Sequence, residues 1–325
     1  MNKKTINYLI SITNYKPIKL TEKISEILDI SFDSAYRRVS NKVEFSVSEL
    51  EKIALYYKFS IDEVLFLSSK KNVLFLTPET VNNTKTFLNF LQETNKMVFE
   101  YINKPNTTIY YSAKDIPFYY TIGQNLLSKL KFYIWMYSTN PDFHLKKIPF
   151  AEFSLTPEIT TESLRISFLN DTTNTTEIWN TTTIDSALYA LEYLNKVKLI
   201  TQYEIESILH ELKELLDLIK LYATGGRKQY GKKFELFHNS LFVMNNSVLF
   251  QSGNESTAVI QYNLIEYLNT KNFKICNQLQ DYFGNQIHLS KNLTKSNEND
   301  RNHFFELLEL KINAFIKNHF VLNSN

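Results

Sequence analysis

Residues 21–64 read TEKISEILDISFDSAYRRVSNKVEFSVSELEKIALYYKFSIDEV, and this stretch decides the architecture of the first part of the chain. Residues that favour helix starts occur in it at intervals of ten to fifteen positions: Thr21, Ser31, Ser46 and Ser60. Two of them have a glutamate three residues later, as in a capping box, where hydroxyl and carboxylate satisfy free amides at the helix start. The stretch therefore predicts a compact bundle of short helices.

The helix expected over residues 31–41 has a small apolar side and a basic side. Ala35 and Val39 lie four positions apart and share one face, where the small Ala35 allows close approach of a helix over 21–30. The DNA major groove admits one α-helix, whose first residues reach the base edges. The outward side of the 31–41 helix offers aromatic, polar and basic residues to such a groove: Phe32, Asp33, Ser34, Tyr36, Arg37 and Arg38.

Positive charge is concentrated at the start of the chain. The first 42 residues hold eight Lys and Arg against four Asp and Glu, whereas all 325 residues together carry a net charge of only +2. A locally basic segment on a nearly neutral protein suits a surface that faces phosphates, and it argues against a chain that coats nucleic acid along its whole length.

Residues 5–67 resemble the Cro-type, phage-repressor-like helix-turn-helix family of transcriptional regulators. The resemblance is carried by the pattern L-x-x-I-A-x-x-Y-x-F-S-x-x-x-V over residues 50–64, after the two helices above. It implies that 21–30 is a scaffold helix, that 31–41 is the recognition helix, and that the protein binds double-stranded DNA. The chain departs from the family where many members have an apolar residue at Arg38 and Gly at Asn41, although Asn tolerates the same left-handed conformation.

The candidate DNA contacts have different expected roles. Arg37 is expected to read guanine, because its guanidinium can donate two parallel hydrogen bonds to one base edge. Arg38 and Lys42 are expected at phosphates, and Tyr36 at a thymine methyl group or a phosphate. Two lysines near the start of the scaffold helix are expected to contact the DNA backbone: Lys19 and Lys23.

We expect a homodimer, because one small helix-turn-helix contacts too little DNA for strong specificity. An alternative is an interaction adaptor whose helix-turn-helix docks on protein rather than on DNA. An enzyme with a DNA-targeting domain is disfavoured, since the six histidines are dispersed and the sequence lacks H-E-x-x-H, G-x-S-x-G and phosphate-loop motifs. We therefore predict no catalytic residue, metal or cofactor.

The cysteine content and the apolar pattern suggest a compartment. The single cysteine, Cys276, excludes a disulfide within one chain and argues against a cysteine-based zinc site, which favours a reducing cytosol. The N-terminus lacks the features of a signal peptide, and no run of about 18 apolar residues is present. A cytoplasmic protein without a membrane partner is expected.

The fold class predicted for the whole chain is multidomain and mainly α. The N-terminal helix-turn-helix bundle at 1–68 is followed by a polar linker at 69–79. A mostly helical sensor and dimerisation region is expected at 80–224, and a small α/β or α+β C-terminal domain at 225–325. The body after the linker also resembles that of a group of bacterial regulators, for example at IYYSAKDIPFYY (109–120), which implies a regulator but identifies no ligand or site. An unknown small-molecule or protein effector is a possible further partner.

Several elements of the remaining chain follow from local patterns. Helices are predicted from Thr77-Pro78-Glu79 to 102, and over 118–138, 183–196, 201–222 and 304–320. The helix over 201–222 has a capping box at Thr201 and Glu204, and it ends at Gly225-Gly226. Strands are predicted over 107–112 and 257–262, and a hairpin over 241–250 around Asn245-Asn246. Residues 141–182 read as irregular.

Three features of the body have two interpretations each. The loop over 225–233 (GGRKQYGKK) has the cations and glycines to grip a phosphate, but a solvated connector between domains is the plainer reading. The aromatic residues over 110–137 form core or line a ligand pocket. The apolar stripe over 201–222 packs within its own domain or forms a dimer interface.

Overall fold

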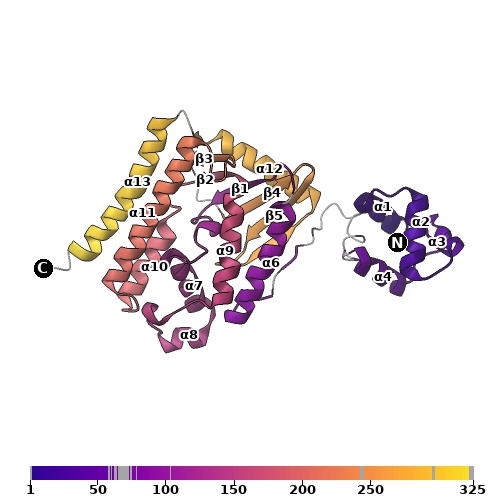
Figure 1. Cartoon of the computed structure of the whole chain (residues 1–325), viewed down its shortest axis with the longest axis horizontal. Helices are drawn as coiled ribbons and strands as arrows, with labels where there is room; N and C mark the ends of the chain where they lie inside the picture. Colours follow the sequence, from indigo (N-terminus) through magenta and orange to yellow (C-terminus); the bar gives the residue numbers. More distant parts are fainter. Residues whose placement is uncertain are drawn as a thin grey trace. The chain divides into compact units, whose positions relative to one another are not determined.

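The computed structural model describes residues 2–57, 59, 61, 64, 73, 75–77, 79–102, 104–241, 245–294 and 297–321. The chain divides into two compact units, Met1–Leu74 and Phe75–Asn325, which we call the head and the body (Figure 1). The predicted capping box at Ser60 and Glu63, most of the helix predicted after it, and part of the predicted linker lie outside the described residues.

The described part of the head is a bundle of short helices around one apolar core. The helices are α1 (Asn2–Thr13), α2 (Pro17–Leu28), α3 (Phe32–Val39) and α4 (Val47–Tyr57). Each helix contributes fully buried or nearly buried residues to that core: Leu9, Leu20, Ile24, Ala35 and Ile53. The predicted bundle of short helices is therefore observed, with the small Ala35 at the centre of the packing.

Two of the four predicted helix-start caps in the head, Ser31 and Ser46, act as the sequence predicts. The Ser31 hydroxyl accepts a hydrogen bond from the Ser34 amide at 3.3 Å. The Ser46 amide donates to the Glu49 carboxylate at 2.9 Å, and the Glu49 amide donates to the Ser46 hydroxyl at 3.2 Å, which completes the capping box. Asn41 adopts a positive φ of 60° directly after α3, in the role that Gly often fills.

The start of the scaffold helix differs from the prediction. Helix α2 begins at Pro17, four residues before Thr21, because proline has the φ of a first helical residue and lacks the amide that would go unpaired there. Thr21 is buried inside the helix, and its hydroxyl donates to the Pro17 carbonyl at 2.8 Å. Thr21 therefore does not cap the helix.

The body is built on one seven-stranded mixed sheet in the order β6-β5-β4-β1-β2-β3-β7. Its strands are β1 (Thr108–Ala113), β2 (Asn174–Trp179), β3 (Phe234–His238), β4 (Ser247–Ser252), β5 (Glu255–Gln261), β6 (Tyr267–Thr270) and β7 (Lys291–Asn292). The central strands β1, β2 and β3 are parallel, and all other pairings are antiparallel. Helical crossovers connect the three parallel strands, as parallel pairing requires.

Helices cover both faces of this sheet (Figure 1). They are α6 (Thr84–Ile102), α7 (Leu126–Thr139), α8 (Pro141–Lys146), α9 (Pro157–Asp171), α10 (Asp185–Lys196), α11 (Gln202–Gly225), α12 (Phe273–His288) and α13 (Glu298–Ile316). Short 3-10 turns η1 (Phe118–Tyr120) and η2 (Phe150–Glu152) and the π-helical segment η3 (Lys317–Val321) complete the described elements. Helix α12 packs on one face of the sheet, where its Phe283 lies in a cluster with Ile178 and Leu249, and the larger core lies on the other face.

The sheet crosses the boundary that the sequence predicts between residues 224 and 225. Strands β1 and β2 come from the region predicted to be mostly helical, and β3 to β7 come from the predicted C-terminal domain. Residues 141–182, predicted as irregular, contain α8, α9 and β2. Strand β2 lacks alternation because it is buried on both sides, and its threonines look like a loop sequence when read without their neighbours.

Three other elements begin or turn at different residues from those predicted. Helix α6 starts at Thr84 rather than at Thr77, since the Asn83 side chain accepts from the amides of Lys85 and Thr86. The segment predicted as a helix over 118–138 is divided into η1 and α7. The two-residue hairpin turn near the predicted one is Gly253-Asn254, between β4 and β5, and residues 242–244 of the predicted hairpin lie outside the described residues.

Other local predictions are confirmed. Strands β1 and β5 and helices α10, α11 and α13 cover the predicted segments, with shifts of a few residues. The capping box of Thr201 and Glu204 is complete, and Gly226 ends α11 with a φ of 64°. The apolar stripe of α11 is buried in the body, as Ile205, Leu212 and Ile219 show.

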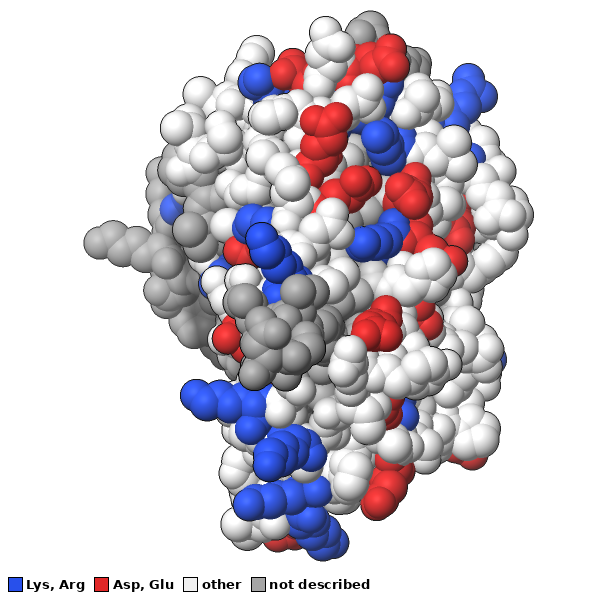
Figure 2. All heavy atoms as spheres, turned by 90° about the vertical axis from the view of Figure 1, so that its left-hand side faces the viewer, with Lys and Arg blue, Asp and Glu red and all other residues white. Residues whose placement is uncertain are grey.

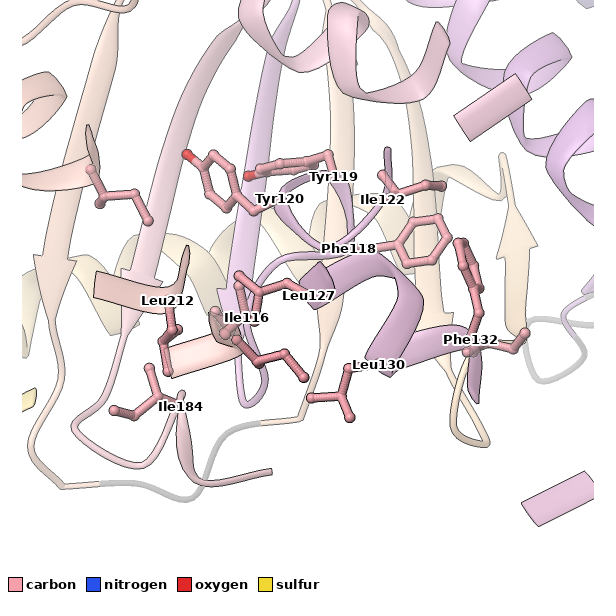
Figure 3. Close-up of a cluster of buried hydrophobic side chains, with 14 of the residues drawn as sticks. Ile116, Phe118, Tyr119, Tyr120, Ile122, Leu127, Leu130, Phe132, Ile184 and Leu212 are labelled. Carbon is pink, nitrogen blue, oxygen red and sulfur yellow. The ribbon is translucent and has the colours of Figure 1, made fainter. Parts of the chain in front are cut away.

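The aromatic segment after β1 forms part of the larger core. Figure 3 shows Tyr119 and Tyr120 lying side by side with their hydroxyl groups on the same side, whereas Phe118 points the other way. Both hydroxyls donate to one oxygen of Glu177 at 2.8 Å, and the Trp179 indole donates to the other oxygen at 2.9 Å. The Glu177 carboxylate is fully buried, so these three donors replace the water that it lacks.

A buried lysine completes this polar cluster. Lys228 is only 3% exposed, and its ammonium donates to the Asn170 carbonyl at 2.8 Å and to the Asn170 side-chain oxygen at 2.5 Å. Burial lowers the pKa of Lys228 to about 8, although the carboxylates of Glu177 and Asp171 oppose the shift. The 225–233 loop therefore places one of its cations inside the body, which corrects its interpretation as a wholly solvated connector.

Candidate nucleic-acid interface

Helix α3 has one face fixed in the head and one face open to solvent. Ala35 and Val39 are buried against α2, with which α3 packs. Phe32 and Tyr36 lie on the open face and are 49% and 48% exposed, respectively. These two half-exposed aromatic side chains are therefore open to an external contact rather than part of the core.

Arg37 lies on the same open face. It is exposed, and in the described part of the chain its guanidinium has no hydrogen-bond or ion-pair partner. Asp33, one turn earlier, is also exposed. The five donors of Arg37 are therefore available to an external acceptor, and its planar shape suits a guanine edge or a phosphate.

Arg38 is held inside the head instead. Its Nη2 lies 2.8 Å from Oε1 of Glu49, its Nε donates to Oε2 of Glu49 at 3.1 Å, and its Nη1 donates to the Ser34 carbonyl at 3.1 Å. The Arg38 side chain is 20% exposed and that of Glu49 is 17% exposed. All three guanidinium nitrogens donate within the protein, so Arg38 joins α3 to α4, and its role at phosphate stays a prediction.

The Glu49 carboxylate serves the capping box and this ion pair together. Burial by itself would raise the pKa of Glu49, but hydrogen bonds from Arg38 and from the Ser46 amide outweigh burial and leave the pKa below its ordinary value. The charged form is therefore the one that the head stabilises. Arg38 and Glu49 fix the rotation of α3 and thereby decide which of its residues face outward.

The turn after α3 is fixed by a residue that the sequence analysis did not single out. The Asn2 side chain, in α1, donates to the carbonyls of Arg38 at 2.9 Å and Val43 at 3.0 Å. Asn2 is only 3% exposed. The contact joins residues 36 and 41 positions apart, and a single sequence carries no local signal for such a pairing.

The three lysines that are predicted to contact DNA differ in the interactions that their ammonium groups make within the head. Lys42 and Lys19 are exposed, and their ammonium groups lie 5.9 Å and 4.6 Å from the ring centroids of Tyr36 and Tyr15. Lys23 lies 2.6 Å from Glu26, whose hydrogen bond and charge raise the pKa of Lys23. An exposed pair of this kind adds little stability, so Lys23 can exchange it for a phosphate at small cost.

Ser34 is the remaining predicted contact. Its side chain is half-buried, its amide donates to the Ser31 hydroxyl, and its own hydroxyl accepts from Ser31 at 3.0 Å. Ser34 therefore belongs to the start of α3 as much as to its open face. The structure brings Phe32, Asp33, Tyr36 and Arg37 together on that face, and we call these four residues the recognition face.

The face of the body formed by α10, α11 and α13 carries charges of both signs. Figure 2 shows acidic and basic side chains interspersed over much of that face, with a group of Lys and Arg side chains at its lower edge. Among the described residues, no group of three or more His, Cys, Asp or Glu side chains is arranged to hold a metal ion. The described helices include none with the length and apolar character of a membrane span.

Comparison with known proteins points to the same part of the chain. Residues 3–86 match the model of the BetR domain, a helix-turn-helix-type DNA-binding domain family. The match covers about a quarter of the chain and includes the four helices that the structure describes in the head, apart from Asn2. No curated protein and no solved structure matches the chain. The head thus carries a DNA-binding type of domain, and DNA is the partner that this domain implies.

Proposed function

We propose that this protein is a sequence-specific transcriptional regulator of the Cro type, whose helix α3 enters the major groove of double-stranded DNA. One observation carries the proposal: the recognition face is open to solvent while Arg38 and Glu49 lock the opposite side of α3 into the head. A groove-reading helix needs this combination, because its side chains reach base edges only from a rigid support. The BetR-domain match at residues 3–86 supports the proposal.

The recognition face has the chemistry for base readout. Arg37 reads a guanine through two parallel hydrogen bonds, and Tyr36 contacts a thymine methyl group or a phosphate. Phe32 and Asp33 lie in the first turn of α3, which is the part of a recognition helix that reaches deepest. The exposed ammonium groups of Lys19 and Lys42, and that of Lys23 once it leaves Glu26, contact phosphates and fix the register.

The rest of the proposal concerns assembly and regulation. The protein acts as a homodimer, because two heads double the number of base contacts. The body supplies dimerisation and senses an effector, and it performs no catalysis. Support for a sensing role comes from its size, since the body is far larger than a dimerisation element needs to be.

The experiment is a mobility shift of the full chain on DNA fragments from its own promoter region, against fragments of unrelated sequence. We expect selective binding that weakens with salt, with a slope of the logarithm of affinity against the logarithm of salt near −0.9 for each phosphate contact. Binding that is absent, or equal on all fragments, would refute the proposal. Partners that survive nuclease treatment in a pull-down, combined with no DNA binding, would show an interaction adaptor instead.

A further inference from the structure

The body contains a cavity of about 560 Å³ between the sheet and the helices on its larger-core side. Helices α6 and α9 and the turn η1 form one wall, and strands β1, β4, β5 and β6 form the other. The volume lies within the range of about 300–1,000 Å³ that is typical of small-molecule sites. Every described residue that lines it belongs to the body.

The wall of this cavity is largely apolar and aromatic. Side chains from four elements contribute to it: Phe90, Met97, Phe118, Val248, Phe250 and Val259. Such side chains offer dispersion contacts and a surface that releases poorly bound water when a ligand enters. The cavity therefore favours an apolar occupant over a hydrated one.

The polar groups deep in the wall already have partners. The Tyr119 hydroxyl donates to Glu177, and the Thr257 hydroxyl is 2.6 Å from the Tyr101 hydroxyl. The oxygens of Asn170 accept from Lys228, and the Tyr111 hydroxyl accepts from the Phe118 amide at 3.3 Å. A ligand with many hydrogen-bonding groups would find few free partners for those groups in this cavity. The cavity therefore selects against polar molecules.

The charged residues that line the cavity do not favour an anion. Glu93 pairs with Lys96 and Glu100 pairs with Lys271, each at 2.6 Å, so both lining lysines are already neutralised. The remaining lining carboxylate is Glu79, to which the Asn89 side chain donates at 3.3 Å. With three carboxylates against two ammonium groups, the charged lining residues give an anionic ligand no net attraction.

From this geometry we infer that the cavity is a binding site for an uncharged, mainly apolar small molecule. Its regulatory meaning rests on the function proposed above, because a sensing body needs such a site. Leu76, Thr77 and Glu79, the first lining residues along the chain after the head, form part of the wall. Leu76 is hydrogen-bonded to Asn269 in both directions, at 2.8 and 3.1 Å, so a ligand there contacts a segment that leads directly to the head in sequence.

The experiment uses the full chain and N-phenyl-1-naphthylamine, an uncharged apolar dye whose fluorescence rises in apolar surroundings. We expect saturable binding of one dye per chain. Met97→Trp fills the cavity from α6 and should weaken binding at least about tenfold. Phe99→Trp is the matched control, because Phe99 lies on the same helix, is 44% exposed and is not among the residues that line the cavity. The Phe99→Trp variant should bind the dye as the unchanged protein does.

Two further measurements keep the result decisive. The anionic dye 1-anilinonaphthalene-8-sulfonate should bind at least about tenfold more weakly than the uncharged dye. If Met97→Trp fails to fold, Met97→Phe fills less of the cavity and should give a smaller loss. Binding that does not saturate, that is equal in Met97→Trp and Phe99→Trp, or that is tighter for the anion would overturn the inference. None of these readouts involves DNA, so a failure of DNA binding leaves them interpretable.

Discussion

The head and the body of this chain use charged residues in opposite ways. In the head, Arg37 lies on an open helix face without a partner among the described residues. In the body, Lys228 and Glu177 are almost completely buried and are surrounded by donors and acceptors. The exposed charge of Arg37 is available to a binding partner. The buried charges of Lys228 and Glu177 need hydrogen-bond partners within the core, because they have lost their contact with water.

The same contrast recurs between two adjacent residues of the head. Arg37 faces solvent, and Arg38 makes a two-bonded ion pair with Glu49. Breaking a buried or partly buried pair costs folding stability, whereas removing an open charge costs only recognition. Substitutions of buried charges are therefore expected to change the free energy of unfolding, and substitutions of exposed charges to change DNA binding.

The largest effect is expected for Lys228→Met. The substitution keeps the bulk of the side chain but removes the buried cation whose charge lowers the pKa of Glu177, and loss of the partner of a buried charge typically costs about 3–5 kcal/mol. The measurement is the free energy of unfolding by denaturant, followed by tryptophan fluorescence. Both tryptophans lie in the body, and the Trp179 indole donates directly to Glu177.

The double variant Lys228→Met with Glu177→Gln provides the control. Removal of both charges should recover a large part of the stability lost in the single variant, since no unpaired charge then remains. Equal instability of the single and double variants would show that the two residues do not act as a charge pair.

A smaller loss of folding stability, of about 1.5–3 kcal/mol, is expected for Arg38→Ala in the head, because a hydrogen bond to a charged group contributes about that much. Hydrogen exchange of peptides from residues 2–57 measures it without interference from the body. Arg37→Ala is the matched control and should leave exchange unchanged. If the two variants behave alike, the ion pair with Glu49 does not fix α3.

The smallest stability effect concerns acid. The pKa of Glu49 lies below its ordinary value of 4.5 in the folded head, so its contribution to stability is fully present above pH 4.5 and is lost as the pH falls through the folded-state pKa. Lower protection factors in α3 and α4, with exchange rates compared with the intrinsic rate at each pH, are expected as the pH decreases over that window. In Glu49→Gln this part of the acid dependence should disappear, and its persistence would assign it to other carboxylates.

The head was the more predictable region because its signals are local. The Ser31 cap, the Ser46 box and the left-handed Asn41 each act within a few residues, and each is confirmed. The predicted start of α2 was wrong. Thr21 has the residue type of a helix cap, but Pro17 sets the first residue of the helix.

The sheet of the body was less predictable because its pairings are distant in sequence. Strands β1, β2 and β3 pair across crossovers, and the threonines of β2 hide its burial. Single contacts between residues distant in sequence were equally hard to predict. Arg38 is hydrogen-bonded to Glu49, eleven residues later, and Lys228, between α11 and β3, interacts electrostatically with Glu177 in β2. Charge and residue type suggest such partners, but only the three-dimensional arrangement shows which residues meet.

The most direct test of the central claim, that the open face of α3 reads DNA sequence, compares Arg37→Ala with Lys52→Ala. Lys52 is an exposed cation of α4 outside the recognition face, so its removal controls for the loss of one positive charge. The measurement is the ratio of affinities for promoter DNA and unrelated DNA at fixed salt. We predict that Arg37→Ala reduces this ratio by about 1–3 kcal/mol, equivalent to roughly 5- to 150-fold, and that Lys52→Ala leaves it unchanged. An equal loss of affinity on both DNAs in Arg37→Ala would contradict the claim and make Arg37 a phosphate contact.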